Sequence, residues 1–235
     1  MIYWFTGQPG SGKTTLAKKL QIWLQTDKAN WRKSVFHIDG DQLRELFPNT
    51  DYSKEGRQKN IQKAIDIAKY LDNCGNDVVV SLVSPYKEMR ETLKSDSKVF
   101  ITLSSVKAVA DKLDDVLTEI TVPSPRTHYG KSKLLAEQYI NSQSIPNGKR
   151  VYILRPCLIH GKSNKGNLNL LFNFVSKGIP WPLGAFENQR SFCTISNLLF
   201  IINELIFRDD IDSGIYNVAD DESLSTNSVI SILSE

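Results

Sequence analysis

Eight residues near the start of the chain have the types and the spacing that bind nucleotide phosphates. They follow the apolar run 2–5 and fit the pattern G-x-x-x-x-G-K-[ST], in which backbone N–H groups and a helix N-terminus surround an anion. In this pattern Lys13 reaches the β- and γ-phosphates, and the Thr14 hydroxyl binds Mg²⁺. We therefore expect a site for ATP and Mg²⁺ on a strand, a turn and a helix. Its members are Gly7, Gln8, Pro9, Gly10, Ser11, Gly12, Lys13, Thr14 and the adjoining Thr15.

A second interpretation of the same turn is a dinucleotide site. Thr6-Gly7-x-x-Gly10 begins like the T-G-x-x-G-x-x-G turn of dinucleotide-binding folds. The third glycine of that pattern falls on Lys13, whose side chain blocks close packing of helix on strand but suits a triphosphate. The lysine thus favours ATP over a dinucleotide at this turn.

Two carboxylates follow the next expected strand. The run 34–38 ends in Asp39-Gly40-Asp41, and the carboxyl end of a strand in such a sheet lies on the ligand side. There Asp39 and Asp41 are candidates to bind Mg²⁺ or to accept a proton from an attacking hydroxyl. The alternative is structural, with Asp41 capping a helix and Asp39 in a turn.

Basic residues suited to an anionic substrate come next. Arg57 and Asn60 are three positions apart, so they share one face of a helix expected over residues 61–71 and the turn before it. With Arg44 they can form a polar clamp for an anion. A continuous apolar run at 78–83 predicts a third, buried parallel strand.

These motifs, in this order, resemble those of adenylylsulfate kinases. The matching pieces are the phosphate turn, the Asp-Gly-Asp segment with Arg44, the pair Arg57 and Asn60, and the segment Ser81-x-x-Ser84-Pro85-Tyr86. The resemblance covers about residues 1–93. The family transfers the γ-phosphoryl group of MgATP to the 3′-hydroxyl of adenylylsulfate, and the resemblance implies that activity here.

The same resemblance implies roles for single residues. Lys13, Asp39 and Asp41 would be catalytic, with Thr14 and Asp39 holding the metal. The adenylylsulfate contacts would be Arg44, Tyr52, Arg57, Asn60 and Ser84, with Tyr52 stacked on adenine in place of the family's Phe. The family's lid, with its Arg-Asp-x-Lys-Gly-Leu-Tyr stretch, and its ATP-adenine pocket have no counterpart in this sequence.

A second set of reactive residue types lies beyond residue 96. A strand expected over 98–103 ends in two serines, and Ser105 is followed further along by Tyr129 and Lys133. Tyr and Lys at i and i+4 lie on one helix face, where the ammonium lowers the pKa of the phenol, which then exchanges a proton with a sugar hydroxyl. Ser105 would hydrogen-bond the same oxygen. A lone Tyr-x-x-x-Lys pattern is also common on solvated helix faces.

This half resembles the extended short-chain dehydrogenase/reductase family, particularly nucleotide-sugar epimerases and dehydratases. Further matching segments are Arg155-Pro156, Asn188-x-Arg190-Ser191-Phe192 and the run 216–222. The resemblance implies catalysis by Ser105, Tyr129 and Lys133, and Arg190 near the diphosphate of a substrate. The family's N-terminal cofactor half has no counterpart, so NAD is expected only if this half functions.

The two halves together predict an α/β fold with a doubly wound, mostly parallel sheet. Residues 1–96 are expected to be P-loop NTPase-like and residues 97–235 Rossmann-like, and no Gly/Ser/Pro-rich linker separates them. P-loop kinases order their strands 2-3-1-4-5. We therefore consider one hybrid sheet, with strand 99–103 fourth and 151–154 fifth, and a smaller lobe appended over 162–225. The alternative is a fusion of fragments.

The bulk composition excludes several classes of protein. Among 235 residues, 29 basic and 26 acidic ones are interspersed, so neither a nucleic-acid nor a membrane partner is expected. The most apolar late run, 198–202, is too short for a membrane span, and the N-terminus is unlike a signal peptide. Three scattered cysteines have no metal-ligand spacing, which predicts buried thiols in a reducing cytoplasm. His37, His128 and His160 form no ligand cluster, and we interpret them as ordinary residues at the ends of strands or loops.

Three functions follow from these patterns. An adenylylsulfate-type kinase comes first because its phosphate-binding turn is present. A nucleotide-sugar epimerase or dehydratase comes second, and a nucleotide-binding protein without turnover third. The expected partners are small-molecule nucleotides, namely ATP and adenylylsulfate or a nucleotide sugar, and a homodimer stays open.

Overall fold

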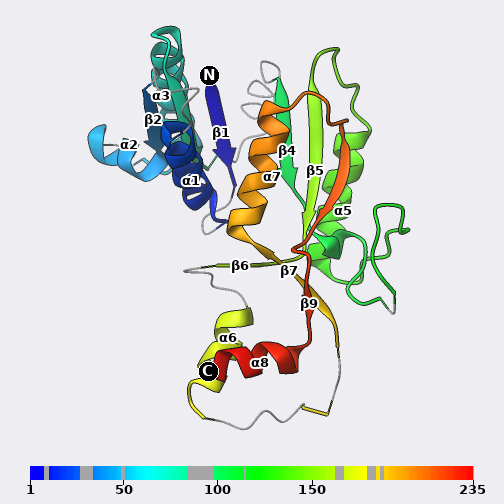
Figure 1. Cartoon of the computed structure of the whole chain (residues 1–235). Helices are drawn as coiled ribbons and strands as arrows, with labels where there is room; N and C mark the ends of the chain where they lie inside the picture. Colours follow the sequence, from blue (N-terminus) through cyan, green and yellow to red (C-terminus); the bar gives the residue numbers. More distant parts are fainter. Residues whose placement is uncertain are drawn as a thin grey trace. The chain divides into compact units, whose positions relative to one another are not determined.

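The computed structural model describes residues 1–7, 11–26, 34–48, 51–83, 98–113, 115–161, 167–178, 184–185 and 188–234, with the side chains of 167, 169 and 170 excepted. The chain separates into two compact units, Met1–Asp96 and Ser97–Glu235. Each unit has its own parallel strands (Figure 1). Each also has its own buried apolar cluster.

The first unit is a parallel sheet in which β3 lies between β1 and β2. β1 spans Ile2–Thr6, β2 spans Val35–Asp39, and β3 spans Asp77–Leu82 with every residue buried. The helices are α1 (Lys13–Thr26), α2 (Gly40–Leu46) and α3 (Lys54–Asn73). The order 2-3-1 expected for a P-loop kinase is therefore confirmed for these three strands.

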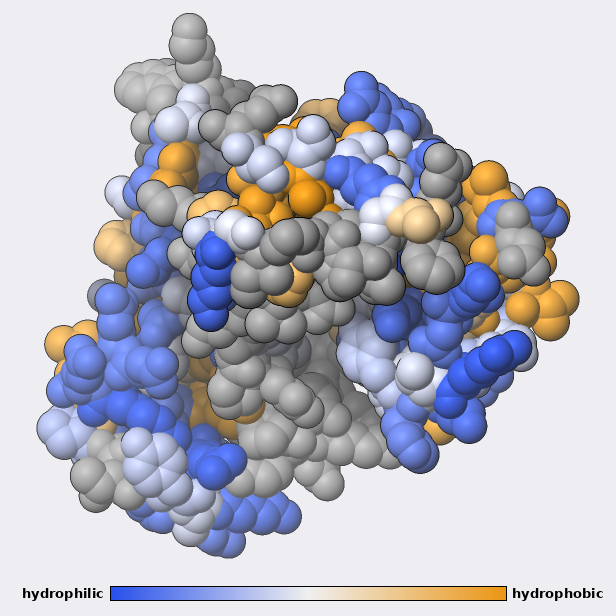
Figure 2. Space-filling model, turned by 90° about the horizontal axis from the view of Figure 1, so that it is seen from below, coloured by the Kyte–Doolittle hydropathy of each residue, from blue (hydrophilic) through white to orange (hydrophobic). Residues whose placement is uncertain are grey.

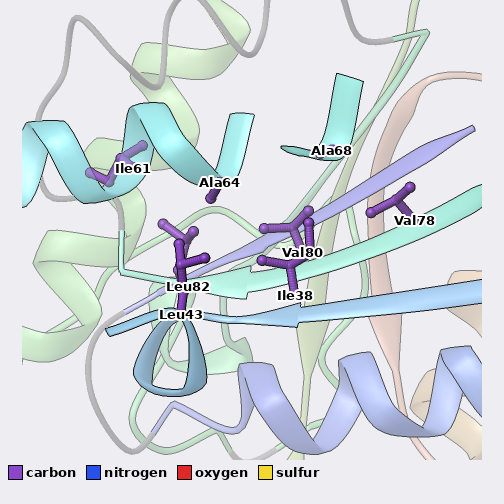
Figure 3. Packing of buried hydrophobic residues seen from close by; sticks show 8 residues of the cluster. All are labelled: Ile38, Leu43, Ile61, Ala64, Ala68, Val78, Val80 and Leu82. Atoms are coloured by element: carbon purple, nitrogen blue, oxygen red, sulfur yellow. The ribbon is translucent and has the colours of Figure 1, made fainter. Parts of the chain in front are cut away.

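Successive side chains of β3 point to opposite faces of the sheet, so they pack against different helices. One face packs against α3 and the start of α2, as Figure 3 shows. The other face, which carries Ser81, packs against α1, whose buried residues recur at helical spacing. The α3-facing cluster consists of Ile38, Leu43, Ile61, Ala64, Ala68, Val78, Val80 and Leu82.

The second unit is built on a parallel sheet of order β4-β5-β8. Its strands are β4 (Val99–Leu103), β5 (Arg150–Pro156) and β8 (Gly214–Val218). The 3-10 helix η2 (Val106–Ala108) follows β4. The other helices beside this sheet are α5 (His128–Asn141) and α7 (Ile195–Phe207). The core consists of Tyr152, Leu154, Cys193, Leu198, Ile202, Leu205 and Val218.

A small lobe of the second unit contains a separate three-stranded sheet. β6 (Leu158–His160) pairs in parallel with β7 (Arg190–Thr194), which pairs antiparallel with β9 (Ser223–Leu224). The helices α6 (Asn167–Val175) and α8 (Thr226–Ser234) lie against each other beside it (Figure 1).

The bounds expected for this lobe are wrong. Residues 162–225 include α7 and β8, which belong to the main sheet, while β6 and α8 lie outside that range. The physical reason is that the chain passes back and forth between the two sheets. β5 runs directly into β6, and β7 runs directly into α7.

Among the described strands, β1 is hydrogen-bonded to β3 in the first unit, and β4 is hydrogen-bonded to β5 in the second. The single hybrid sheet that we considered stays a hypothesis. The expected neighbours 99–103 and 151–154 do pair, with Val99 opposite Arg150 and Leu103 opposite Leu154.

The surface departs from one expectation of the sequence. Cys193 is buried and Cys157 half-buried, but Cys74 is exposed because it caps the C-terminus of α3. Apolar residues also reach the surface among hydrophilic ones (Figure 2), and in the loop before α5 the side chains of Val116 and Ile120 are 86% and 92% exposed. Within the described ranges, no helix has the length and apolarity that a membrane crossing requires.

Candidate functional site

The described part of the phosphate-binding turn joins β1 to α1 as expected. Gly12 has a φ of 81°, in the left-handed region that glycine adopts without strain, and its carbonyl accepts the N–H of Leu16 at 3.0 Å. Lys13 is the first residue of α1 and Thr14 the second, so both stand at the positive end of the helix. Gln8, Pro9 and Gly10 lie outside the described residues.

Asp39 is the centre of a hydrogen-bonded network at the carboxyl end of β2. Its Oδ2 accepts the Thr14 hydroxyl at 3.1 Å and the Ser81 hydroxyl at 2.9 Å. Ser81 Oγ lies 2.8 Å from His37 Nε2. Because Asp39 pairs with Ser81 in the parallel register, β2 and β3 bring these side chains together against the start of α1.

The network determines the ionisation of Asp39. Burial alone would raise the pKa of this carboxyl group, but hydrogen bonds from the Asp41 N–H and from the Ser81 and Thr14 hydroxyls outweigh it and hold the pKa below its ordinary value. Burial also lowers the pKa of His37, against the charge of Asp39 and together with that of Lys18. Asp39 is therefore a carboxylate, with oxygens available only as acceptors.

Asp39, rather than Asp41, caps α2. The Asp39 Oδ1 atom accepts the N–H of Asp41 at 3.0 Å, while Asp41 lies exposed in the first turn of the helix. The capping alternative considered for Asp41 is therefore wrong, because the helix begins two residues earlier than that alternative requires. Gly40 lets α2 start so close to β3, since a Cβ there would lie 2.9 Å from the Cβ of Leu82.

Three of the expected substrate contacts lie together where α2 and the start of α3 meet. The guanidinium carbon of Arg44 is 4.8 Å from the ring centroid of Tyr52, and Arg57 Nε donates to the Tyr52 carbonyl at 2.9 Å. The Tyr52 ring is 65% exposed and so is accessible to a ligand. Asn60 is only 5% exposed, and its Oδ1 has no hydrogen-bond partner among the described residues. Ser84 lies outside the described residues.

The donor set at the first site fits Mg²⁺ and a nucleotide. Mg²⁺ is a hard cation held by one or two protein oxygens together with substrate phosphates and waters. The Thr14 hydroxyl and the Asp39 carboxylate are two such oxygens that already share one hydrogen bond. Among the described residues, no group of three or more His, Cys, Asp and Glu side chains could hold a metal ion.

The second expected site lies where β4 meets α5. Lys133 Nζ donates to the Leu103 carbonyl at 3.0 Å and lies 5.7 Å from the ring centroid of Tyr129. Burial lowers the pKa of Lys133, against the opposing charge of Glu137. The Tyr129 side chain is 53% exposed, and Ser105 Oγ accepts the N–H of Lys107 at 3.3 Å as the cap of η2.

A buried ionic network lies directly behind this second site. Arg155 of β5 and Glu137 of α5 are both 3% exposed and form an ion pair with an Nη2–Oε2 distance of 2.6 Å. The Ser104 hydroxyl also donates to Glu137. This network fixes α5 on the sheet, and with it the positions of Tyr129 and Lys133.

Arg190 lines a pocket of the small lobe. The pocket has a volume of about 170 Å³, and apart from Arg190 and Thr226 its lining is apolar. It lies between β6, β7, α6 and α8 and is made by Leu158, Leu168, Leu171, Arg190, Phe192, Thr226 and Val229.

Sequence reasoning missed two members of the first network. We interpreted His37 as an ordinary strand residue, and Ser81 only as part of a matching segment. His37 and Asp39 are two apart on a strand and therefore share a face, which was a usable signal. Ser81 joins them only through the register of β2 against β3, which no local pattern specifies.

Fold and site together define the class of protein. It is an α/β protein whose first unit has a parallel sheet with the strand order of a P-loop kinase and whose second unit has parallel Rossmann-like strands. Residues 1–113 match the family model of adenylylsulphate kinase, beyond the end of the motifs quoted from the sequence. The N-terminal resemblance is thus confirmed: this part of the chain is similar to adenylylsulphate kinases, and a second part is similar to a UDP-glucose 4-epimerase.

Similar proteins fall into the same two groups. The adenylyl-sulfate kinase of Staphylococcus epidermidis is 36% identical over 95 residues, which are 40% of this chain and 46% of that protein. The UDP-glucose 4-epimerase of Vibrio cholerae is 30% identical over 149 residues, or 60% of this chain and 44% of that one. The chain thus spans about half the length of the curated relatives it matches.

A solved structure shows the likeness in fold. The Bordetella bronchiseptica enzyme WbmG, crystallised in complex with NAD, superimposes with a TM-score of 0.62 at 17% identity. The match covers 99% of this chain and 77% of WbmG. At this identity the likeness establishes the α/β fold and nothing about ligands.

Proposed function

We propose that the first unit binds MgATP and transfers its γ-phosphoryl group to the 3′-hydroxyl of adenylylsulfate. The observation that carries the proposal is the Thr14–Asp39–Ser81 network, which joins the first turn of α1 to the ends of β2 and β3. The family match over residues 1–113 supports the same assignment.

Each described side chain has a separate task in this proposal. The N-terminal turn of α1 and Lys13 bind the phosphates. When bound, Mg²⁺ would neutralise charge on the phosphates, and Thr14 and Asp39 would hold it. Arg44 and Arg57 bind the anionic end of the acceptor, and the exposed Tyr52 ring stacks on its adenine. Asp41, exposed beside Asp39, is the carboxylate available to take the hydroxyl proton.

The test is direct transfer of label from ATP to adenylylsulfate by the full chain. We expect product from the wild type. The rate should fall about 100-fold or more in Lys13→Ala, because the negative charge of the transferred phosphoryl group loses the lysine cation that stabilises it. Lys69→Ala, which removes an exposed lysine of α3, is the matched control and should keep full activity. No product from the wild type above the Lys13→Ala background would exclude the kinase. MgATP binding without transfer would then favour a nucleotide-binding protein without turnover.

A second candidate concerns the second unit and nucleotide sugars. The observation in its favour is the Lys133 ammonium beside the Tyr129 ring, with the Arg190 pocket in the small lobe of the same unit. With NAD bound, Tyr129 would exchange a proton with a sugar hydroxyl, and Ser105 would hydrogen-bond the same oxygen. Calorimetric titration of NAD and a UDP-sugar tests this function, and absence of NAD binding excludes it. For either function we retain the cytoplasm as the compartment.

A further inference from the structure

Four side chains form a hydrogen-bonded series on the α1-facing side of the first sheet. From β2 inward it runs from His37 Nε2 to Ser81 Oγ over 2.8 Å and from Ser81 Oγ to Asp39 Oδ2 over 2.9 Å. The Thr14 hydroxyl then reaches the same Oδ2 at 3.1 Å. Three different elements, α1, β2 and β3, contribute to it.

The number of protons available fixes which group donates in each of these hydrogen bonds. Asp39 is a carboxylate and can only accept, so the single hydroxyl proton of Ser81 is donated to Asp39. The Ser81 oxygen must then accept from His37, which requires the His37 proton on Nε2. Without that proton, the Ser81 hydroxyl would be free to turn toward the imidazole and away from Asp39.

Both oxygens of Asp39 are therefore held. The Oδ1 atom is fixed by the N–H of Asp41, and Oδ2 by Ser81 and Thr14. Ser81 is 1% exposed, which excludes it as a nucleophile and leaves it the role of a link between His37 and Asp39. Groups behind a metal ligand that fix its orientation commonly tune the binding of the metal.

We propose that His37 is a positioning residue of the nucleotide site, acting through the Ser81 hydroxyl to hold Asp39 Oδ2 at the Thr14 hydroxyl. The inference deepens the proposed function and rests on it, because the Thr14–Asp39 pair is the place at which Mg²⁺ of the nucleotide would be held. His37 itself touches neither substrate nor metal in this arrangement.

The first test needs no ligand and no turnover. The ¹⁵N–¹³C spectrum of the imidazoles in the full chain contains three histidines, and His37→Gln identifies the signal of His37. We expect neutral His37 to carry its proton on Nε2, and Ser81→Ala to move its ring signals. A proton on Nδ1 in the wild type, or a His37 signal that is unchanged in Ser81→Ala, overturns the inference.

The second test measures the Mg²⁺-dependent part of ATP binding. Calorimetry with ATP in Mg²⁺ and in chelator is run on wild type, His37→Leu, His37→Gln and Ser81→Ala. We expect His37→Leu to weaken the Mg²⁺-dependent gain in affinity by about tenfold or more and to leave Mg²⁺-free binding unchanged. His37→Gln, whose amide can still donate to Ser81, should restore most of the gain. In the Ser81→Ala background, His37→Leu should have no further effect.

The controls separate positioning from folding and from the kinase assignment. Phe36→Leu changes an exposed neighbour on the opposite face of β2 and should bind MgATP like the wild type. Equal losses in His37→Gln and His37→Leu, additive losses with Ser81→Ala, or a wild type without any Mg²⁺-dependent gain would each contradict the inference. A wild type that binds MgATP with this dependence but transfers no phosphoryl group would remove the kinase and leave the role of His37 intact.

Discussion

Asp39 makes contacts with three different elements through two oxygen atoms, so its charge and its shape can be separated by substitution. Asp39→Asn keeps the volume but replaces one acceptor oxygen by an N–H donor, which cannot accept from Ser81 or Thr14. We expect phosphoryl transfer to fall about 100-fold or more, because the carboxylate that serves metal and transfer is lost. Initial-rate measurements with labelled ATP check this.

A surface carboxylate provides the comparison for Asp39. Asp66 lies exposed on α3, where it accepts from Gln62, and Asp66→Asn should transfer phosphate like the wild type. Full activity in Asp39→Asn would show that this carboxylate has no part in transfer, whatever its position.

At the scale of elements, the start of α5 is held by the partly buried carboxylate of Asp111. Asp111 accepts the N–H groups of Arg126 and Thr127 at 2.8 and 3.0 Å, and these bonds hold its pKa below the ordinary value. A carboxyl group whose pKa is lower in the folded than in the unfolded state stabilises the fold at pH values above the unfolded-state pKa. This stabilisation is lost as the pH falls through the folded-state pKa. We therefore expect wild type to unfold at a higher temperature than Asp111→Asn at pH 7, with the gap closing toward pH 3.

Thermal unfolding followed by circular dichroism across that pH range measures the gap. A matched variant is Asp115→Asn in the same loop, which should show no comparable dependence on pH. If the gap between wild type and Asp111→Asn were the same at pH 3 and pH 7, the carboxylate would not be the group that anchors α5.

The other end of the contact between α5 and its sheet is the buried pair of Glu137 and Arg155. Glu137→Ala leaves the Arg155 charge 3% exposed and without its carboxylate, which should cost about 3–5 kcal/mol of stability. The double variant Glu137→Leu/Arg155→Met removes both charges and should recover much of that loss. Urea unfolding gives both values, and equal stability of the single and double variants would contradict this account.

The sequence predicts single elements better than the contacts between them. Strand β3 was predictable because Val78, Val79 and Val80 form a continuous apolar run, and α1 because its leucines recur at helical spacing. The site residues Thr14 and Asp39 were predictable because each ends or begins an element at the ligand side of a parallel sheet. The role of Ser81 was not predictable, because its contact with Asp39 depends on the register of β2 against β3. The role of His37 was not predictable either, because its contact is with Ser81.

At the scale of the whole molecule, the order of motifs predicted two family segments but not their sheets. Local patterns specify each strand, whereas the choice of hydrogen-bonded neighbour depends on which buried cluster the strand joins. β4 pairs with β5 and packs against the core around Tyr152 and Leu154. The lobe bounds failed for the same reason, because α7 joins the core of the main sheet although β7, directly before it in sequence, belongs to the small lobe.

The division into two units predicts which part of the chain each ligand protects. A ligand that binds only the folded state slows amide exchange most where it bonds the backbone and its supporting elements. We expect MgATP to slow exchange in 11–16, 35–43 and 77–82, and UDP to slow it in 158–160 and 190–194. Hydrogen exchange of the full chain read by mass spectrometry distinguishes these segments, and Lys13→Ala should remove the first effect without the second. Protection of 158–194 by MgATP in that variant would place the ATP site outside the first unit and contradict the assignment of the P-loop.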